Sequence, residues 1–151
     1  MIPKFWKLSQ GTDFFSFEKI SDSIEKGLVY VHAHTAAKGR SSEAQGEKFI
    51  DANIGDYFYL THGNTGIYLL GQFTGPANIF SSRGHGWTDR PFRVIRHAKP
   101  NAGYSGPHKW WAPNDRSTFT SVPNNQLTEF EEHILVPFFG ITLADYGVDA
   151  V

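Results

Sequence analysis

The sequence predicts a single α+β domain. Segments in which apolar and polar residues alternate, typical of strands, are interspersed with segments whose apolar residues recur at helical spacing. The chain has 151 residues, enough to enclose one core without disulfides, and it contains no cysteine. It carries 13 Phe, 6 Tyr and 4 Trp. That is more ring surface than such a core requires, so we expect some rings to face a ligand.

The first strand is predicted over residues 4–8 (KFWKL). Period-two alternation places Phe5 and Lys7 on one face and Trp6 and Leu8 on the other. The turn-forming residues that follow predict that the strand ends in a loop.

The next elements are a helix, a second strand and a second helix. Apolar spacing predicts the first helix over residues 15–26, and Gly27 stands at the position of a C-terminal glycine. Residues 28–34 (LVYVHAH) alternate again and predict the second strand. Capping-box spacing in residues 42–45 predicts a second helix that runs to about residue 53.

The middle of the chain predicts a hairpin. An aromatic strand over residues 57–60 is followed by a Gly-rich turn at 62–66 and a strand over 67–73. Residues 76–89 then predict a loop, and loops of this length are often functional. Residues 90–98 (RPFRVIRHA) predict a further strand.

The last third predicts loops and one helix. Residues 99–125 are Pro-rich, with one short strand expected near 117–122. Thr128 and Glu131 have capping-box spacing and predict a helix. Its buried face is predicted to contain Phe130, Ile134, Leu135 and Phe138. We therefore expect one domain over residues 1–139, with 140–151 beginning a linker to a domain outside this chain.

The charges are nearly balanced. With 14 Lys plus Arg against 15 Asp plus Glu, bulk electrostatics does not predict a protein that coats nucleic acid. Residues 83–99 nevertheless form a local basic segment, whose alternative interpretation is an ordinary solvated strand face. The N-terminal segment has no apolar stretch typical of a leader peptide, and no run is long enough to span a bilayer. We expect a cytoplasmic protein.

Residues 54–75 resemble the core of EVE domains. They contain Gly55-Asp56, an aromatic strand, a turn, and a second strand that begins with Gly66-Ile67. YTH domains share this plan, and the order of the surrounding elements fits over roughly residues 4–98. The resemblance implies a PUA-like fold, in which a small mixed, barrel-like β-sheet is flanked by helices.

The C-terminal part extends the resemblance to a biological setting. Residues 110–114 (WWAPN) and the last helix are similar to N-terminal recognition modules of Mcr-type (McrB-like) modification-dependent restriction endonucleases. In those proteins a nucleotide-driven motor follows. This chain has no GxxxxGK[ST] motif, so we expect any motor or nuclease to lie outside it and to form the oligomeric assembly.

The function implied by the resemblance is recognition of a modified DNA base, expected to be methylated, that is flipped into an aromatic pocket. Stacking contributes roughly 1–3 kcal/mol per base, and a buried methyl adds ~1 kcal/mol. No cofactor and no catalysis by the domain itself are expected. Methylated RNA is an alternative ligand, since YTH domains bind it.

The implied pocket lies where the ends of the first two strands, the start of the second helix and the loop after the hairpin converge. Its residues are predicted to be Trp6, Ser9, His32, His34, Gln45, Tyr57, Tyr59, Phe80, Trp87, Trp110 and Trp111. The phosphate contacts are predicted to be Lys38, Arg40, Arg83, Arg90, Arg93 and Arg96. Rings on alternating strands belong to the core more often than to a cage, which favours the loop rings as ligand contacts. YTH domains have a cage tryptophan at the end of the second strand, where this sequence has Tyr30, His32 and His34.

A metal-dependent enzyme is the competing hypothesis. His32 and His34 share one face of the second strand, as ligands of strand-borne metal sites do. A third ligand would come from His62, His85 or His108, although their spacing matches no known metal motif. The prediction for bound metal is therefore none.

Overall fold

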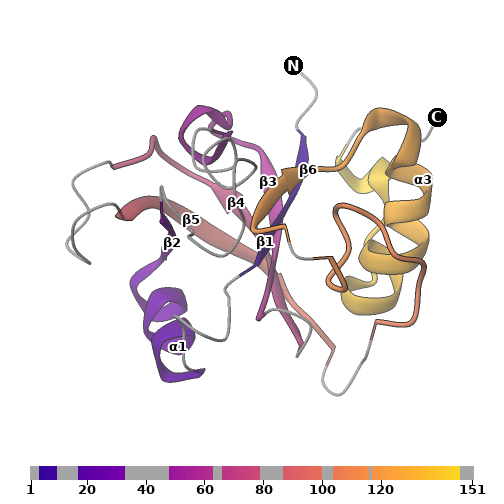
Figure 1. The fold of residues 1–151 in the computed structure, drawn as a ribbon, viewed down its shortest axis with the longest axis horizontal. Coiled ribbons are helices and arrows are strands. Elements are labelled where there is room, and N and C mark those ends of the chain that lie inside the picture. Colours follow the sequence, from indigo (N-terminus) through magenta and orange to yellow (C-terminus); the bar gives the residue numbers. More distant parts are fainter. Residues whose placement is uncertain are drawn as a thin grey trace.

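The structure of the chain is a computed structural model, and it describes residues 4–9, 17–32, 48–62, 66–78, 87–99, 104–115 and 117–146, except for the side chains of 17–20, 32 and 87. Six strands form one mixed sheet in the order β2-β5-β4-β3-β1-β6 (Figure 1). The strands are β1 (Phe5–Ser9), β2 (Leu28–His32), β3 (Tyr57–Thr61), β4 (Ile67–Phe73), β5 (Trp87–His97) and β6 (Phe119–Ser121). The predicted α+β class with a small, barrel-like sheet is confirmed.

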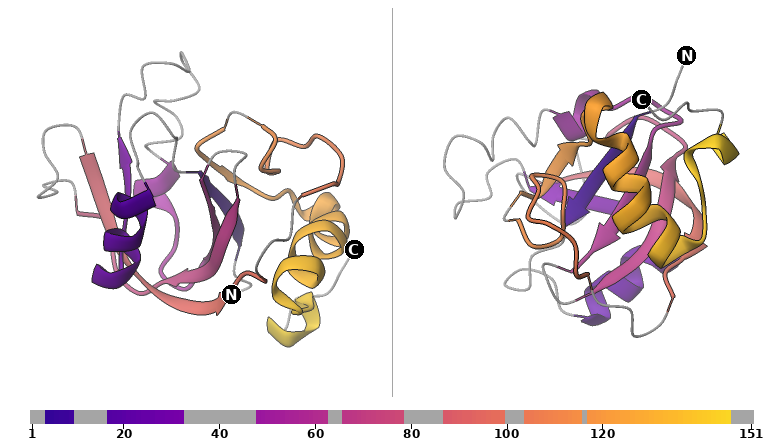
Figure 2. Two further views of the ribbon diagram at one scale, coloured as in Figure 1. Left: turned by 90° about the horizontal axis from the view of Figure 1, so that it is seen from below. Right: turned by 90° about the vertical axis from the view of Figure 1, so that its right-hand side faces the viewer.

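The helices lie at the two flanks of the sheet. They are α1 (Phe17–Lys26), η2 (Asn124–Gln126), α3 (Leu127–Phe130), η3 (Glu131–Phe139) and η4 (Leu143–Tyr146), and residues 48–51 are also helical. Figure 2 shows the sheet curled into a half-barrel, with α1 near β2 and β5 and the C-terminal helices outside the opposite flank. Gly27 ends α1 with a φ of 68°, as its position in the sequence predicts.

Strand direction determines which ends of the strands meet. β1 and β3 are parallel, with Phe5 opposite Tyr57 and Ser9 opposite Thr61. The remaining neighbours in the sheet are antiparallel. The carboxyl ends of β1 and β3 therefore lie at the same edge of the sheet.

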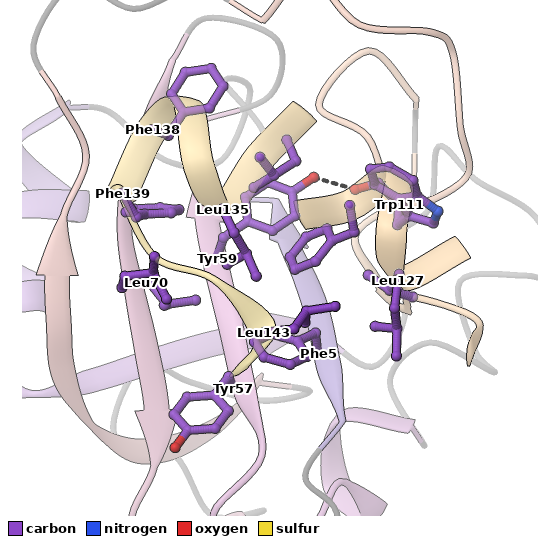
Figure 3. Packing of buried hydrophobic residues seen from close by; sticks show 14 of the residues in the cluster. Phe5, Tyr57, Tyr59, Leu70, Trp111, Leu127, Leu135, Phe138, Phe139 and Leu143 are labelled. Atoms are coloured by element: carbon purple, nitrogen blue, oxygen red, sulfur yellow. Dashed lines mark hydrogen bonds between the residues drawn. The ribbon is translucent and has the colours of Figure 1, made fainter. Parts of the chain in front are cut away.

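Two clusters of apolar side chains pack on the two faces of the sheet. Trp6 and Leu8 belong to the inner cluster, together with Phe58, Phe73 and Phe119. Phe5 belongs to the outer cluster, which the C-terminal helices cover (Figure 3). The alternation predicted for the first strand is thus confirmed.

Close packing at Gly71 accompanies the curl of the sheet. A Cβ atom at this position would lie 2.7 Å from Cζ of Phe58 and 2.9 Å from Cδ2 of Phe92. The β4–β5 register also shifts between Leu70 and Gly71. Such an irregularity bends a strand and increases its local twist, which suits a half-barrel.

The structure corrects three predictions about the ends of elements. β5 begins at Trp87, so residues 87–89 belong to a strand and not to the preceding loop. No side chain caps α3, whose N-cap is Gln126, and the Glu131 carboxylate instead accepts the backbone N–H of Leu143 at 2.6 Å. The predicted capping box is therefore wrong.

The third correction concerns the predicted linker. Ile141 and Leu143 are buried in the outer cluster, and Tyr146 packs against it. Gly140 takes a left-handed φ of 66° and reverses the chain at the end of η3. Residues 141–146 therefore belong to the domain because their apolar side chains complete its core.

The C-terminal helix changes its hydrogen-bonding pattern along its length. Residues 131–139 form a π-helix that contains Pro137. Proline has no backbone N–H to donate, and π-helical turns accommodate such interruptions. Among the residues that the structure describes, no helix combines the length and apolar character needed to cross a membrane.

Candidate functional site

Buried polar side chains gather at the carboxyl ends of β1 and β3. Lys7 is fully buried, and its Nζ donates to the backbone oxygen of Asp115 at 2.8 Å and to Oγ of Ser117 at 3.0 Å. The other buried polar side chains at this edge are Ser9, Thr61, His62, Ser117, Thr118 and Thr120. Burying so many polar groups is costly unless they are hydrogen-bonded, so a concentration of them needs a structural or functional reason.

Ser9 is the last residue of β1 and belongs to the predicted pocket. Ser9 is only 6% exposed, and its backbone N–H donates to the backbone oxygen of Thr118 at 2.7 Å. Within the described part of the chain, Oγ of Ser9 has no hydrogen-bonding partner, in contrast to Oγ1 of Thr61, which donates to the oxygen of Gly66 at 3.0 Å. A buried hydroxyl of this kind is a ready group for a ligand.

The Trp110-Trp111 pair lies in a loop held against this edge. Oγ of Ser117 donates to the backbone oxygen of Trp110 at 2.6 Å. The Tyr59 hydroxyl donates to the backbone oxygen of Trp111, as the dashed line in Figure 3 shows. Nε1 of Trp111 donates to Oε1 of Gln126 at 2.7 Å. The loop is therefore anchored both to the sheet and to the C-terminal helices.

Three of the predicted pocket rings belong to the core. Trp111 and Tyr59 are fully buried, and Tyr57 is buried in the same outer cluster. Burial, with smaller contributions from Tyr104 and Asp115, raises the pKa of Tyr59 well above its ordinary value. The prediction that these side chains contact a ligand is corrected, because their rings pack among the apolar side chains of the outer cluster.

Trp6 lies near the opposite edge, at the amino ends of β1 and β3. Its Nε1 donates to Oδ2 of Asp56 at 3.0 Å, and its ring stacks on Phe119 with 4.4 Å between centroids. Asp56 also accepts the backbone N–H of Lys4 at 3.0 Å and that of Asn53 at 3.1 Å. The Trp6 ring is therefore held in place by these contacts and offers no open surface for stacking.

A cavity of about 270 Å³ adjoins Trp6. Its lining consists of Lys4, Trp6, Lys48, Asp51, Ala52, Asn53 and Asp56. Its volume is at the small end of ligand pockets, and its charged groups are of both signs. The cavity does not include Ser9, so the structure separates two predicted pocket residues on the same strand.

The structure contradicts the prediction that Arg90 contacts a phosphate and shows that its role is structural. It is 1% exposed. Its Nη1 donates to the backbone oxygens of Phe49 at 2.9 Å and Ala52 at 2.6 Å, and its Nε and Nη2 donate to Gly75 at 3.2 and 3.0 Å. Burial lowers the pKa of Arg90, and the charge of Asp56 opposes this shift. A guanidinium occupied in this way cannot reach a phosphate.

Arg93 and Arg96 are exposed, as phosphate contacts must be. Nε of Arg93 donates to Oε1 of Gln72 at 2.7 Å, and Nη1 of Arg96 donates to the backbone oxygen of Phe139 at 3.1 Å. Across the sheet, Arg93 is paired with Gln72, Gln72 with Tyr57, and Tyr57 with Phe5 of β1. Strand spacing and rise then place Arg93 roughly 20 Å from Ser9.

The backbones of His32 and Trp87 lie opposite each other in the β2–β5 ladder. The two residues are far apart in the sequence, and the register brings them together at one end of the pair. β4 and β3 lie between β5 and β1, the strand that carries Ser9. The other predicted site residues, namely His34, Lys38, Arg40, Gln45, Phe80 and Arg83, lie outside the described residues, as do the side chains of His32 and Trp87.

The metal hypothesis gains no support from the described residues. They contain no group of three His, Cys, Asp or Glu side chains that could hold an ion. His108 contacts Asp115 instead, with 3.0 Å between Nε2 and Oδ1. His34 and His85 lie outside the described part, so the hypothesis stays a prediction.

Sequence reasoning did not assign Lys7 or Asp56 to any site. A signal for Lys7 was present, because alternation places it beside Phe5 on a face that the helices cover. Asp56 belongs to the Gly-Asp pair of the EVE-like stretch, but nothing in the sequence indicates that its carboxylate holds Trp6. The partners of both residues come from distant parts of the chain.

Comparisons with known proteins describe the fold. No protein-family model matches the chain, and no curated protein matches it at a significant level. The crystal structure of protein PSPTO5229 from Pseudomonas syringae is similar, with a TM-score of 0.53 and 14% identity, covering 85% of this chain and 97% of that one. Protein Atu2648 from Agrobacterium tumefaciens gives a TM-score of 0.49 and 15% identity, covering 87% and 88%. At this level of identity, the first similarity shows that the chain shares its overall fold with a solved bacterial protein.

Proposed function

We propose that this domain is a nucleic-acid reader that holds one extruded, modified base at the carboxyl ends of β1 and β3. The observation that carries the proposal is the buried hydroxyl of Ser9, which lies among other polar side chains and has no partner among the described residues. The EVE-like stretch and the barrel-like sheet support it. The domain itself is proposed to bind without catalysis.

Polar groups at the carboxyl ends of β1 and β3 are suited to hydrogen-bond with the edge of a base. Lys7 and Ser9 share one face of β1, and Tyr59 and Thr61 lie opposite them in β3. Hydroxyl groups such as that of Ser9 donate to the carbonyl and ring-nitrogen acceptors of bases. A base inserted here would satisfy the Ser9 hydroxyl, and a methyl on that base would add ~1 kcal/mol when buried.

The preferred ligand is DNA, and the proposed setting is a restriction system in which motor and nuclease subunits act in the cytoplasm. This choice rests on the similarity of residues 110–114 and the C-terminal helix to Mcr-type modules. Among the predicted phosphate contacts, Arg93 and Arg96 are described and exposed, so they are proposed to contact phosphates. Phosphate contacts position the duplex without reading its sequence.

Binding competition tests the proposal. Labelled duplexes carrying N6-methyladenine, 5-methylcytosine or 5-hydroxymethylcytosine are competed against plain duplex and against single-stranded RNA with and without a methylated base. We expect one modified duplex to bind tightest, and Ser9→Ala to reduce its advantage over plain DNA by roughly 5-fold or more, because a hydrogen bond to the base is lost. Thr61→Ser, which retains a hydroxyl, is the matched control.

Three results would contradict parts of the proposal. Equal binding of modified and plain probes by the wild type would exclude base reading. An unchanged preference in Ser9→Ala would exclude the site at β1. Tighter binding of methylated RNA than of every duplex would assign the same pocket to RNA.

A further inference from the structure

Trp110 is the most exposed tryptophan whose side chain the structure describes. It is 55% exposed, whereas its neighbour Trp111 is 0% exposed. Tryptophan is enriched at binding surfaces, because its large ring contributes much contact area. The contrast within one dipeptide shows that the loop buries one indole as an anchor and presents the other to solvent.

The loop holds Trp110 in a fixed position. Tyr59 and Gln126 hold Trp111 from the sheet and the helix side, respectively. Nζ of Lys109 lies 3.1 Å from Oε2 of Glu129 on α3, and Ser117 bonds the Trp110 oxygen. A ring presented on an anchored loop loses little conformational freedom when it binds, which favours recognition by stacking.

The position of Trp110 connects it to the proposed base site. Lys7 bonds Oγ of Ser117, which in turn bonds the backbone oxygen of Trp110. Ser9 pairs with Thr118, the next residue along the loop. The backbone of Trp110 therefore lies close to the edge that carries Ser9, and its side chain is far more exposed than Ser9, which is 6% exposed.

We propose that Trp110 stacks on the base next to the one held at Ser9, so that the preferred ligand is a strand with two unstacked neighbouring bases. This inference rests on the proposed function. A hydroxyl on a residue that is 6% exposed would read a base from inside the domain, whereas a ring that is 55% exposed can stack on a base that stays at the surface. Two successive bases of a single-stranded or locally opened segment fit both positions, since every base offers a face to an aromatic ring.

An abasic-site experiment tests this inference. The probes are short single strands that carry one of the three modified bases, with either a normal base or an abasic site on its 5′ or 3′ side. For the wild-type protein we expect an abasic site on one side to weaken binding roughly 5- to 100-fold, the range for loss of one base–aromatic stack. Trp110→Ala should weaken binding to the intact probe by a similar factor and remove the abasic effect.

Two variants serve as controls. Trp110→Phe retains a stacking ring and should keep most of the abasic effect. Ser9→Ala should reduce the preference for the modified base and leave the abasic effect in place. Thermal unfolding of Trp110→Ala confirms that the variant is folded, as expected for an exposed side chain.

The outcomes separate this inference from the proposed function. If wild-type protein prefers modified probes but Trp110→Ala binds them equally well, the stacking role of Trp110 is wrong and the Ser9 site stands. If the abasic effect persists in Trp110→Ala, another group contacts the neighbouring base and the inference is also wrong. If the wild type prefers neither a modified duplex nor a modified single strand to its plain counterpart, both proposals fail.

Discussion

The guanidinium carbon of Arg90 lies 4.4 Å from the centroid of the Phe73 ring, in the interior of the curled sheet. Its nitrogens bond three backbone oxygens that come from residues 49–52 and Gly75. This contact joins the helical segment before β3, the chain after β4 and the strand β5. A residue that the basic segment suggested as a DNA contact therefore holds the fold together.

Replacing Arg90 should destabilise the protein. We expect Arg90→Ala to lower the free energy of unfolding by roughly 3 kcal/mol, because buried carbonyl oxygens lose a charged donor. Urea denaturation followed by tryptophan fluorescence measures the change. Arg93→Ala is the matched control, and its exposed position predicts a change within about 0.5 kcal/mol. Equal stability of the two variants would contradict the structural role of Arg90.

Arg93 should contribute to affinity for DNA and not to base preference. We expect Arg93→Ala to weaken modified and plain duplexes by the same factor, because a phosphate contact carries no sequence information. The slope of log affinity against log salt should fall by about 1. Binding titrations at several salt concentrations measure both effects. A selective loss for modified duplex would place Arg93 in the base site instead.

Asp56 should be important for stability, whereas Asp51 should not. The two oxygens of the Asp56 carboxylate accept three N–H groups. In Asp56→Asn one of these oxygens is replaced by an NH₂ group, which donates and cannot accept, so the amide cannot accept all three. We expect a loss of roughly 2 kcal/mol in the free energy of unfolding. Asp51→Asn, an exposed change in the same cavity, should alter it by less than about 0.5 kcal/mol. A reversed order of the two effects would be incompatible with the Asp56 hydrogen bonds.

The Tyr59 hydroxyl should make stability depend on alkaline pH. Burial raises the pKa of Tyr59 in the folded state above its unfolded value. The contribution of this group is therefore complete below pH ~10 and declines as pH rises further, because only the unfolded chain can ionise it easily. Thermal melting of the wild type and Tyr59→Phe between neutral and alkaline pH tests this.

Tyr59→Phe has two expected effects. At neutral pH it should cost about 1 kcal/mol or more, since the buried oxygen of Trp111 loses its donor. Above pH ~10 the difference between variant and wild type should shrink, because phenylalanine does not titrate. A constant difference across the whole range would show that Tyr59 ionises equally easily in both states.

The sequence by itself determined the elements and their faces. Alternation identified β1 with Phe5 and Trp6 on opposite faces, and Gly27 ended α1 as expected. These features depend on residues near each other in the chain, whose period and backbone preferences are local properties. The helix face with Phe130 and Ile134 followed from the same logic.

Only the tertiary structure decided which side chains are buried and which are exposed. A ring in a strand and a ring in a loop give similar sequence signals, yet Trp111 is buried and Trp110 is exposed. Likewise, Arg90 and Arg93 occur in one basic segment, but the curl of the sheet encloses the first and leaves the second outside. Burial depends on packing between distant segments, so the spacing of residues along the chain cannot determine it.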